Sequence, residues 1–414
     1  MAKELFYTAV DIGSNKVASV IARVGTEGEL KVLGTGLAPS QGVQKGRIES
    51  IDEASDAVSA SLEEAQRYIA RGLIAGVYAV VSGTHTSCIN TKDVIKDVGD
   101  LGSITPQQIH RLIQSSFPSV DDTKEVLHVI PIGYEVDGLP GVRNPTGLHA
   151  NEVQVESHVV MGDAITLKNT VKAVESNKVA VKSLVLQSLA SAEATLTADE
   201  RELGAVMVDI GSGTADLAIF RYGNPWYTAV IPVGGSQLTR DLAVAARIPY
   251  HLAEEIKVKW GHVLPDMVRA DEEVVVPGYQ GQPRRVVLRR ALCEPLHLRM
   301  LEVIKLIMLR VTQAGLRQLP TGGLVLTGGA AEMAGLKELV EKTLGGPVRI
   351  AYPSGIAGLP SQLRKPAFSA AVGALLWGIK HQGESRRYQT ASRTLWGYKS
   401  LVKRLARVKE GASQ

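Results

Sequence analysis

The chain of 414 residues contains few cysteines, few aromatic side chains and no long apolar run. Its two cysteines, Cys88 and Cys293, are far apart in sequence, which excludes a disulfide framework and the paired spacing of a zinc site. No run of about 18 apolar residues is present, so we expect no segment that spans a membrane. The residues before Asp11 include no apolar stretch of signal-peptide length, and a reducing cytosol is the expected compartment.

Acidic and basic residues are distributed unevenly along the chain. The formal net charge is +4, but the residues from Ser385 onward include eight Lys and Arg and one acid, Glu410, a net charge of +7. Residues 1–384 therefore carry a net charge of −3. A mildly acidic body disfavours a broad nucleic-acid-binding face, so no nucleic acid is expected as a partner.

The most informative stretch is residues 206–216, which read V-M-V-D-I-G-S-G-T-A-D. A short apolar strand ends at Asp209, a turn containing Gly211 and Gly213 follows, and residues 217–220 form a second strand. Because a strand and not a helix follows the glycines, the pattern is neither a Walker A loop nor a dinucleotide-binding fingerprint. Taken alone, the stretch is also consistent with an ordinary hairpin turn.

A second copy of this pattern changes its interpretation. Residues 6–10 form a strand that ends at Asp11, and residues 17–24 return as a strand, which predicts a duplicated lobe. Two such turns facing each other across a cleft can hold the β- and γ-phosphates of ATP from both sides. Asp11 and Asp209 are the candidate residues for holding Mg²⁺ through water. The candidate phosphate-binding residues are Gly13, Ser14, Asn15, Lys16, Gly211, Ser212, Gly213 and Thr214.

Two further features are candidate adenosine contacts. Gly328 and Gly329 follow a buried strand and allow the backbone to approach a flat ligand. Glu254 and Lys257 are three residues apart on one predicted helix face, from which they could reach the ribose and the base edge. Each feature also has a simpler explanation, a strand cap for the glycines and a surface ion pair for the charged residues.

Alternating strand and helix patterns predict an α/β protein. The predicted helices are residues 52–71, 107–115, 164–176, 188–196, 234–247, 252–260, 293–316, 333–344 and 367–379. Further predicted strands are residues 30–36, 76–82, 126–132, 153–160, 179–186 and 324–326, and residues 272–290 have a β-like pattern. Residues 84–163, with a loop at 137–145, are interpreted as an inserted α/β subdomain.

The order of these motifs resembles the actin, sugar kinase and heat-shock-70 ATPase superfamily and, more narrowly, the FtsA family of bacterial cell-division proteins. The resemblance covers essentially the whole chain. The segments that carry it are D-I-G-S-N-K (11–16), V-R-N-P-T-G-L (142–148), L-A-S-A-E-A-T-L-T-A-D-E-R-E-L-G (189–204), D-I-G-S-G-T (209–214), I-P-V-G-G-S-Q-L-T-R-D-L-A (231–243), A-E-E-I-K-V-K-W-G (253–261) and T-G-G-A (327–330).

The resemblance implies an actin-like two-lobe fold with duplicated cores. The small subdomain of the first actin lobe is missing, and an inserted subdomain placed elsewhere takes its role. The implied division is a first-lobe core (1–83, 164–205 and 361–384), the inserted subdomain (84–163), a second-lobe core (206–247 and 320–360), its outer subdomain (248–319), a linker (385–394) and a terminal helix (395–409).

The resemblance also implies a role for Gln187, which stands where the superfamily orients the attacking water. A neutral amide positions water but is a poor base, so we expect slow hydrolysis, with the nucleotide acting mainly as a structural switch. The chain departs from the family at the second turn, where Ser212 and Ala215 replace more usual residues. The Ser212 hydroxyl can still donate to a phosphate.

The partners implied by the resemblance are a second copy of the chain, the tubulin-like division protein FtsZ and later division proteins. The C-terminal tail of FtsZ is expected to bind residues 248–319. That contact includes a basic residue soon after Glu294 and Pro295 in the family, but Leu296 and His297 follow here, so Arg299 is the candidate.

The end of the chain has the pattern of an interfacial membrane helix. At 100° per residue, one face is apolar and the other is basic. A helix packed on the protein's own core is the alternative, which the polar linker and the scarcity of acids disfavour. The candidate membrane-binding residues, which face anionic lipids, are Leu395, Trp396, Tyr398, Lys399, Leu401, Val402, Lys403, Arg404, Leu405 and Arg407.

The sequence therefore predicts an ATP- and Mg²⁺-binding, actin-like division protein at the cytoplasmic face of the membrane, which polymerises and tethers the division ring. A superfamily kinase acting on a small molecule is one alternative, although no separate substrate motif with a catalytic Asp is found. A membrane-linked pilus-assembly scaffold is another, which the basic terminal helix and the full 248–319 region disfavour.

Overall fold

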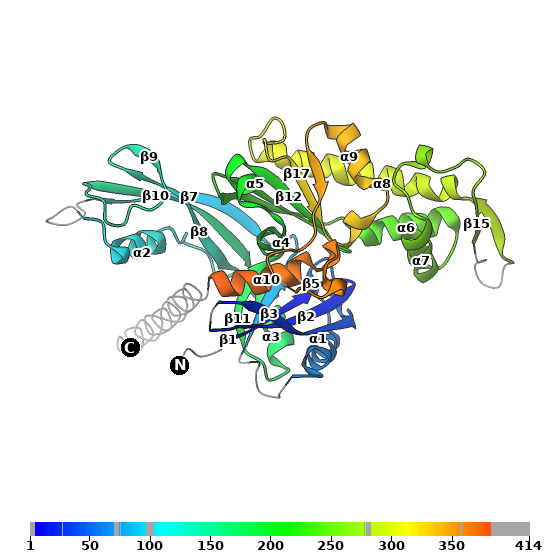
Figure 1. Ribbon diagram of the computed structural model, residues 1–414, viewed down its shortest axis with the longest axis horizontal. Helices are drawn as coiled ribbons and strands as arrows, with labels where there is room; N and C mark the ends of the chain where they lie inside the picture. The colour runs from blue at the N-terminus through cyan, green and yellow to red at the C-terminus, as the bar shows by residue number, and fades with distance from the viewer. Residues whose placement is uncertain are drawn as a thin grey trace, which may run out of the picture.

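The computed structural model describes residues 5–381, apart from 27, 70–73, 75, 97–102, 277, 279–282 and 357. The described part is elongated (Figure 1), with two sheet-containing lobes in the middle, a third sheet at one end and a helical region with a two-stranded sheet at the other. The predicted linker at 385–394 and the predicted helix at 395–409 lie outside the described residues.

The sheet of the first lobe combines an antiparallel meander with two parallel strands. In the meander, β1 pairs with β2 and β2 with β3, whereas β6 lies parallel to β1 and β11 parallel to β6. The strands, in their order across the sheet, are β3 (Leu30–Pro39), β2 (Lys16–Val24), β1 (Leu5–Ile12), β6 (Val77–Val81) and β11 (Val181–Leu186).

The sheet of the second lobe repeats this topology strand for strand. Again a three-stranded antiparallel meander is followed by two parallel strands, on the side of its first strand. Its strands, in the same order, are β14 (Asn224–Ile231), β13 (Ala215–Arg221), β12 (Ala205–Ile210), β17 (Leu324–Thr327) and β18 (Val348–Ile350). The duplication predicted from the two Asp-x-Gly turns is therefore present at the level of the whole sheet.

Helices cover both sheets, which explains why the central strands are continuous apolar runs. In the first lobe these are α1 (Ile51–Gln66), α3 (Ala164–Glu175), α4 (Gln187–Thr195) and α10 (Ser369–Lys380). The remaining chain forms α5 (Ala198–Leu203), α6 (Gly235–Ala246), α7 (Tyr250–Trp260), α8 (Arg289–Gln313) and α9 (Leu336–Leu344). Helix α10 crosses α4 closely because Gly373 has no side chain, since a Cβ there would lie 1.7 Å from the carbonyl oxygen of Ala190.

The inserted region forms an antiparallel sheet with one helix. Its strands, in sheet order, are β7 (Ser87–Lys96), β10 (Glu152–Asp163), β8 (Lys124–Val136) and β9 (Leu139–Val142), and its helix is α2 (Pro106–Ser115). Thr105 caps α2, with its side chain accepting from the amide of Gln108, as the Thr-Pro start predicts.

Several boundaries differ from those predicted; the helix predicted for 293–316, for example, spans Arg289–Gln313. The helix predicted for 52–71 ends at Gln66, and the two residues that follow, Arg67 and Tyr68, are exposed. The loop predicted at 137–145 contains β9, which pairs with β8. The helix predicted to start at 333 starts at Leu336, because a 3-10 turn at Gly329–Glu332 precedes it.

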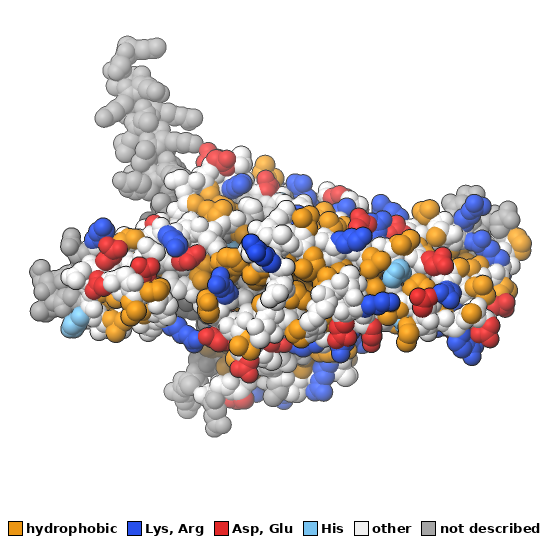
Figure 2. Space-filling model, turned by 90° about the horizontal axis from the view of Figure 1, so that it is seen from above, with side chains coloured by type: hydrophobic (Ala, Val, Ile, Leu, Met, Phe, Trp, Pro, Cys, Tyr) orange, Lys and Arg blue, Asp and Glu red, His pale blue; other side chains and the backbone are white. Residues whose placement is uncertain are grey.

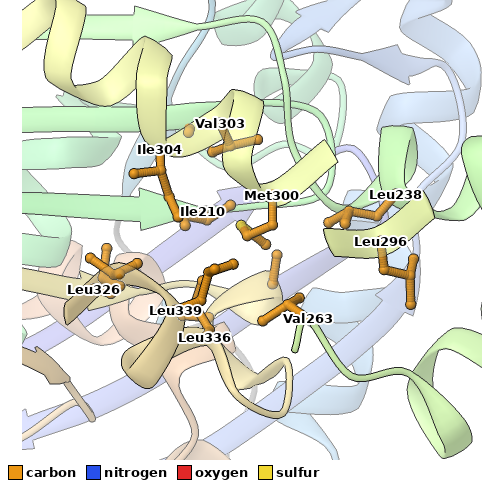
Figure 3. Packing of buried hydrophobic residues seen from close by; sticks show 14 of the residues in the cluster. Ile210, Leu238, Val263, Leu296, Met300, Val303, Ile304, Leu326, Leu336 and Leu339 are labelled. Atoms are coloured by element: carbon orange, nitrogen blue, oxygen red, sulfur yellow. The ribbon is translucent and has the colours of Figure 1, made fainter. Parts of the chain in front are cut away.

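The outer region of the second lobe is built on α8, whose apolar residues recur every three or four positions. Figure 3 shows Ile304 of this helix directed toward Ile210 on β12, Met300 toward Leu339 on α9, and Leu296 beside Leu238 on α6. Ile210, immediately before the second glycine turn, belongs to the same cluster. Packing in this core therefore fixes where that turn lies. The region also contains the hairpin of β15 (Glu273–Val276) and β16 (Arg285–Leu288).

A buried histidine joins the inserted sheet to the second lobe. His158 lies on β10, with its Nδ1 2.8 Å from the Asn90 side-chain oxygen and its Nε2 3.2 Å from the Thr228 hydroxyl on β14. The amide of Asn90 donates to the Trp226 carbonyl, so its oxygen faces the histidine and His158 is neutral with a proton on Nδ1. Burial lowers the pKa of His158 to about 4.

None of the helices in the described part of the chain is long and apolar enough to cross a membrane.

We expect acid to loosen the contact between the insert and the second lobe. Because the folded-state pKa of His158 lies below the usual value of 6.5, its contribution to stability is complete above pH 6.5 and is lost as the pH falls toward about 4. The loss is on the order of 3 kcal/mol at the acid limit. Thermal unfolding of the wild type and of His158→Gln between pH 4 and 8 measures it. If acid lowers the thermal unfolding midpoint of the wild type no more than that of His158→Gln, protonation of His158 does not destabilise the fold and the prediction is wrong.

Candidate functional site

The two Asp-x-Gly turns close in the same way. The amide of Gly13 donates to the carbonyl of Lys16 at 3.1 Å, and the amide of Gly211 donates to the carbonyl of Thr214 at 2.9 Å. Each bond joins a glycine to the residue three positions later, directly after a strand whose last two residues are Asp-Ile. The sequence repeat is therefore also a repeat of backbone geometry.

The turns meet where the two lobes face each other. A Cβ on Gly213 would lie 2.7 Å from the hydroxyl oxygen of Ser14, so the second turn packs directly on the first and only glycine fits there. The Ser14 hydroxyl also accepts from the amide of Gly46 at 3.4 Å. The fold thus brings together two segments that are about 200 residues apart, as the sequence predicts.

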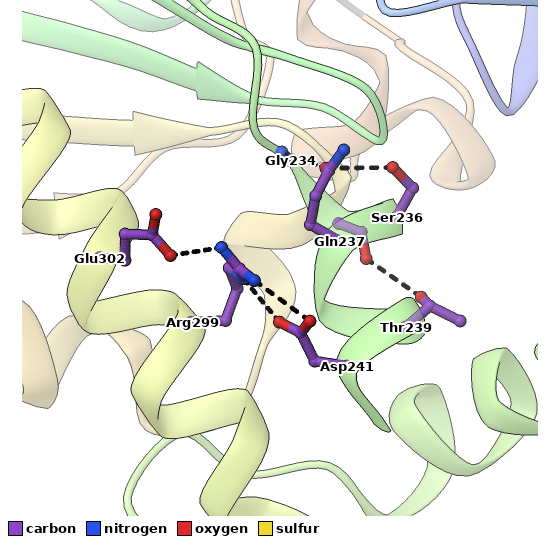
Figure 4. Close-up of polar contacts among 8 residues, drawn as sticks. Gly234, Ser236, Gln237, Thr239, Asp241, Arg299 and Glu302 are labelled. Carbon is purple, nitrogen blue, oxygen red and sulfur yellow. Dashed lines mark hydrogen bonds and ion pairs between the residues drawn. The ribbon is translucent and has the colours of Figure 1, made fainter. Parts of the chain in front are cut away.

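The carbonyls of the second turn are held by the start of α6. The amides of Gly235 and Ser236 donate to the carbonyls of Gly211 and Ser212 at 2.9 and 2.8 Å. Figure 4 shows this helix start, where the Gln237 side chain accepts from the amide of Gly234. The carbonyls of the turn point toward α6, and the opposite side of the turn therefore faces the first lobe. That orientation suits amides that are to face an anion.

Three carboxylates lie close together beneath the turns. Burial raises the pKa of Asp11 to about 6, and the pKa of Asp209 is also raised by burial. Burial, together with the charges of Asp209 and Asp11, raises the pKa of Asp216 to about 7, against the hydrogen bonds from Ser82 and Thr214. The nearby charge of Lys16 opposes the rise for Asp11 and Asp209. Such a site favours a bound cation, because the cation stabilises the ionised carboxylates.

The sequence reasoning did not assign a role to Asp216 or to the serines that bond to these acids. The hydroxyl of Ser82 in the first lobe donates to Asp216 at 2.7 Å and lies 3.1 Å from the Thr214 hydroxyl, so it joins the two lobes. The hydroxyl of Ser191 donates to Asp209 at 2.5 Å. Ser82 directly follows strand β6, beside β1, and the end of a parallel strand is the signal that could have identified it.

Lys16 lies at the first turn but is partly engaged by other groups. Its Nζ donates to the carbonyl of Ala367 at 2.8 Å and lies 4.7 Å from the centre of the Phe368 ring. The neighbouring Asn15 is exposed. Lys16 therefore connects the first turn to the segment that leads into α10.

Gln187 is the first residue of α4, next to the second turn. Its side chain forms a hydrogen bond with Asp209, and its Nε2 lies 3.7 Å from the position of a Cβ on Gly211. The amide is thus near the expected position of the terminal phosphate, but it also orients the aspartate. Its role toward water stays a prediction.

The pair Glu254 and Lys257 lies behind the second turn, on α7. The Nζ of Lys257 donates to Glu254 at 2.7 Å, to the Thr239 hydroxyl at 2.8 Å and to the Gly235 carbonyl at 3.2 Å. These three bonds use the three hydrogens of the ammonium group, which is buried. Of the two side chains Glu254 is the more exposed, at 38%, so it is the better placed to contact a ligand.

Gly328 lies against Asp209 in a left-handed conformation. Its φ is +87°, and a Cβ there would lie 2.3 Å from the Oδ1 of Asp209, so both the backbone and the space require glycine. Gly329 follows and starts the 3-10 turn. The candidate adenosine loop is therefore adjacent to one of the candidate magnesium residues.

The donors at this point are carboxylate oxygens, which suit a hard cation such as Mg²⁺. Within the described ranges, no group of three or more His, Cys, Asp and Glu side chains is arranged to hold a metal ion directly. Asp11 and Asp209 fit a hydrated Mg²⁺ held through water, because such an ion keeps several of its waters.

The candidate docking residue Arg299 is occupied by contacts within the protein. Figure 4 shows its guanidinium against Asp241 and Glu302, with the two Asp241 bonds at 2.5 and 3.1 Å. Hydrogen bonding to Asp241 raises the pKa of Arg299. Leu296 is fully buried in the core, so it is not available to a partner.

Two sequence models of known families match the chain. Residues 206–373 match the family "Cell division protein FtsA", and residues 83–161 match "SHS2 domain inserted in FTSA". The second match coincides with the inserted sheet.

Solved structures show a similar fold. One is a PilM–PilN type IV pilus biogenesis complex, with a TM-score of 0.65 at 16% identity, covering 90% of this chain and 98% of that chain. Another is MreB5 of Spiroplasma citri bound to AMPPNP, with a TM-score of 0.53 at 12% identity, covering 94% of this chain and 100% of that chain. The fold is therefore actin-like with an SHS2 insert.

Sequence relatives narrow this to one family. The cell-division protein FtsA of Pseudomonas aeruginosa is 34% identical over 376 residues, which is 91% of this chain and 89% of that protein. FtsA of Escherichia coli is also 34% identical, over 94% of both chains. Together with the two-lobe fold and the SHS2 insert, this similarity shows that the chain belongs to the FtsA family of cell-division proteins.

Proposed function

We propose that the chain binds ATP with Mg²⁺ between its two glycine turns. The observation that carries this proposal is the direct packing of Gly213 on Ser14, which places both turns at one point above buried carboxylates. Asp11 and Asp209 hold the ion through water, Gly13 to Lys16 and Gly211 to Thr214 hold the phosphates, and Glu254, Lys257, Gly328 and Gly329 surround the adenosine. The ion, when bound, neutralises phosphate charge.

Hydrolysis is slow in this proposal, and the nucleotide acts mainly as a switch. Gln187 is the only candidate we assign to water positioning, and a neutral amide is a poor base. Its hydrogen bond to Asp209 further limits its freedom to orient water. Closure of the lobes on ATP then favours assembly with further copies of the chain.

The cellular role that we propose is that of a tether. Polymers of the chain hold the tubulin-like protein FtsZ at the cytoplasmic face of the membrane and recruit later division proteins. One basic amphipathic helix at 395–409 binds anionic lipid weakly, whereas many helices on one polymer bind strongly through their effective concentration. Membership in the FtsA family supports the division role.

The outer region of the second lobe is the proposed docking surface for the FtsZ tail. Exposed apolar side chains on this region include Val258, Met267, Val275 and Val286. Figure 2 shows that end of the molecule, on the right, with apolar side chains interspersed with charged ones. Because Arg299 is paired with Asp241 and Leu296 is buried, apolar contacts contribute most of the binding.

The two alternatives have less support. The hypothesis of a pilus-assembly scaffold is supported only by the similarity of the fold to PilM. At 16% identity, that similarity concerns the architecture alone. A small-molecule kinase would require a substrate-binding group with a catalytic Asp in the cleft, and the three acids described there are bonded to serines or placed for the ion.

The substitution Gly213→Ala tests the proposed nucleotide cleft. Gly213→Ala adds a methyl group 2.7 Å from the Ser14 hydroxyl and 2.9 Å from the Cα of Lys45, so the turns must separate. We expect ATP affinity to fall at least about 10-fold, a cost typical of overpacking. Gly133→Ala is the matched control, because a Cβ there meets nothing within 4 Å. Calorimetric titration with Mg-ATP measures the affinity of both variants. Equal affinities would contradict the proposal that the two turns together bind ATP.

Replacement of Gln187 tests the proposed slow turnover of ATP. Gln187→Ala should lower the rate of ATP hydrolysis by about 10-fold or more, because water positioning and acid–base assistance contribute factors of this size. The affinity for ATP should change less than about threefold. Phosphate release at saturating ATP measures the rate, and an unchanged rate would remove Gln187 from the proposed mechanism.

A charge placed on the predicted terminal helix tests the proposed membrane contact. Leu401→Glu places a charge on the apolar face of the predicted terminal helix, whereas Ser400→Glu adds the same charge to its polar face. Sedimentation with phosphatidylglycerol vesicles should show a large loss of binding for Leu401→Glu, as for deletion of 394–414, with ATP binding retained. If the deletion variant still sediments with the vesicles, the proposal that the terminal helix binds the chain to the membrane is wrong.

A further inference from the structure

A short hairpin in the first lobe takes the chain position that a whole subdomain has in the second. It consists of β4 (Val43–Gln44) and β5 (Arg47–Ile48), between β3 and α1. In the second lobe the corresponding interval, between the third and fourth strands of the repeat, holds the large outer region. The first lobe thus contributes only the tip of this hairpin, Lys45 and Gly46, at the corresponding place.

The tip lies on the candidate phosphate turns. The Cα and N of Lys45 are 2.9 and 3.1 Å from the position of a Cβ on Gly213 in the second turn. The amide of Gly46 donates to the hydroxyl of Ser14 in the first turn at 3.4 Å. A Cβ on Gly46 would also lie 2.5 Å from the carbonyl oxygen of Ser82. The tip therefore contacts both turns at the point where the lobes meet.

The backbone of the tip is unfavourable for a lysine. Lys45 has φ +48° and Gly46 has φ +75°, the two left-handed residues of a tight hairpin turn that Asn-Gly normally forms. A lysine in this conformation is strained, because its Cβ crowds its own backbone. Strain of this kind is found where a side chain is needed at a particular place.

The side chain of Lys45 is available to a ligand. It is exposed, and within the described part of the chain it forms no ion pair. Lys16, the cation already assigned to the turns, donates to the Ala367 carbonyl and lies near Asp11 and Asp209. A triphosphate held above three carboxylates needs more positive charge than Lys16 supplies, and a flexible ammonium group is a common phosphate ligand.

We propose that Lys45 binds the terminal phosphate of the nucleoside triphosphate, so that the β4–β5 hairpin distinguishes ATP from ADP. The inference rests on the proposed nucleotide cleft. The terminal phosphate is the relevant one because Lys257 lies behind the second turn, against Gly235, whereas Lys45 lies on the opposite, first-lobe side of that turn. The adenosine end and the hairpin tip are thus on different sides of Gly211–Thr214.

The test compares two nucleotides on three variants of the full chain. Lys45→Met keeps the length of the stem and removes the charge, Lys45→Gly removes the charge and relieves the backbone, and Lys31→Met removes an exposed lysine on β3. Calorimetric titration with Mg-AMPPNP and Mg-ADP gives the affinities. We expect both Lys45 variants to bind AMPPNP about 10- to 100-fold more weakly and ADP within about threefold of wild type, with Lys31→Met unchanged.

If Lys45→Met and Lys45→Gly lose the same affinity for AMPPNP while Lys45→Gly is the more heat-stable, the loss is due to the missing charge and not to a change in the fold. Unchanged AMPPNP affinity, or an equal loss for AMPPNP and ADP, would overturn the assignment to the terminal phosphate while leaving the cleft intact. If the wild type itself binds neither nucleotide, the proposed function fails and the role of Lys45 fails with it.

Discussion

The close placement of three carboxylates, two of them buried and one half-buried, at the meeting point of two lobes is the constraint on which the rest of this structure depends. Asp11, Asp209 and Asp216 have raised pKa values because they are removed from water and lie near one another. Unpaired buried charge is costly, so the surrounding fold must supply donors. Ser82 and Ser191 provide two of them, and the hydroxyl of Ser82 crosses from one lobe to the other. These acids make the site receptive to a cation, because a cation stabilises ionised carboxylates.

The duplicated sheet places the aspartates and glycine turns, and the two copies differ in the elements that support each turn. Both sheets have one topology, so each contributes an aspartate and a glycine turn at the same strand end. In the second copy, helix α6 holds the turn carbonyls and α8 anchors the preceding strand. In the first copy, the short β4–β5 hairpin, with Lys45 and Gly46 in left-handed conformations, lies against the turn instead of a helix. The inserted sheet follows the fourth strand of the first copy and reaches β14 through His158, so it contacts both lobes.

Side-chain roles were harder to infer than backbone motifs. Glu254 and Lys257 are three residues apart on a helix, and the sequence allowed a ligand pair or a surface pair; the structure has Lys257 buried and bonded to the start of α6. Arg299 was the candidate for a partner's tail, but Asp241, on another helix, holds it. Each outcome depends on a neighbour that is distant in sequence.

The sequence by itself determined the two turns, their aspartates, the α/β class and the duplication, because these depend on local glycine spacing and on apolar strands read directly from the chain. It also determined the insert and the start of its helix at Thr105, where capping chemistry is local. Only the tertiary structure decided that Gly213 packs on Ser14, that Ser82 bonds across the lobes to Asp216, and that the hairpin tip of Lys45 and Gly46 contacts both turns. These contacts join residues that are about 30 to 200 positions apart, and no local pattern specifies which distant surfaces meet when two lobes close on each other.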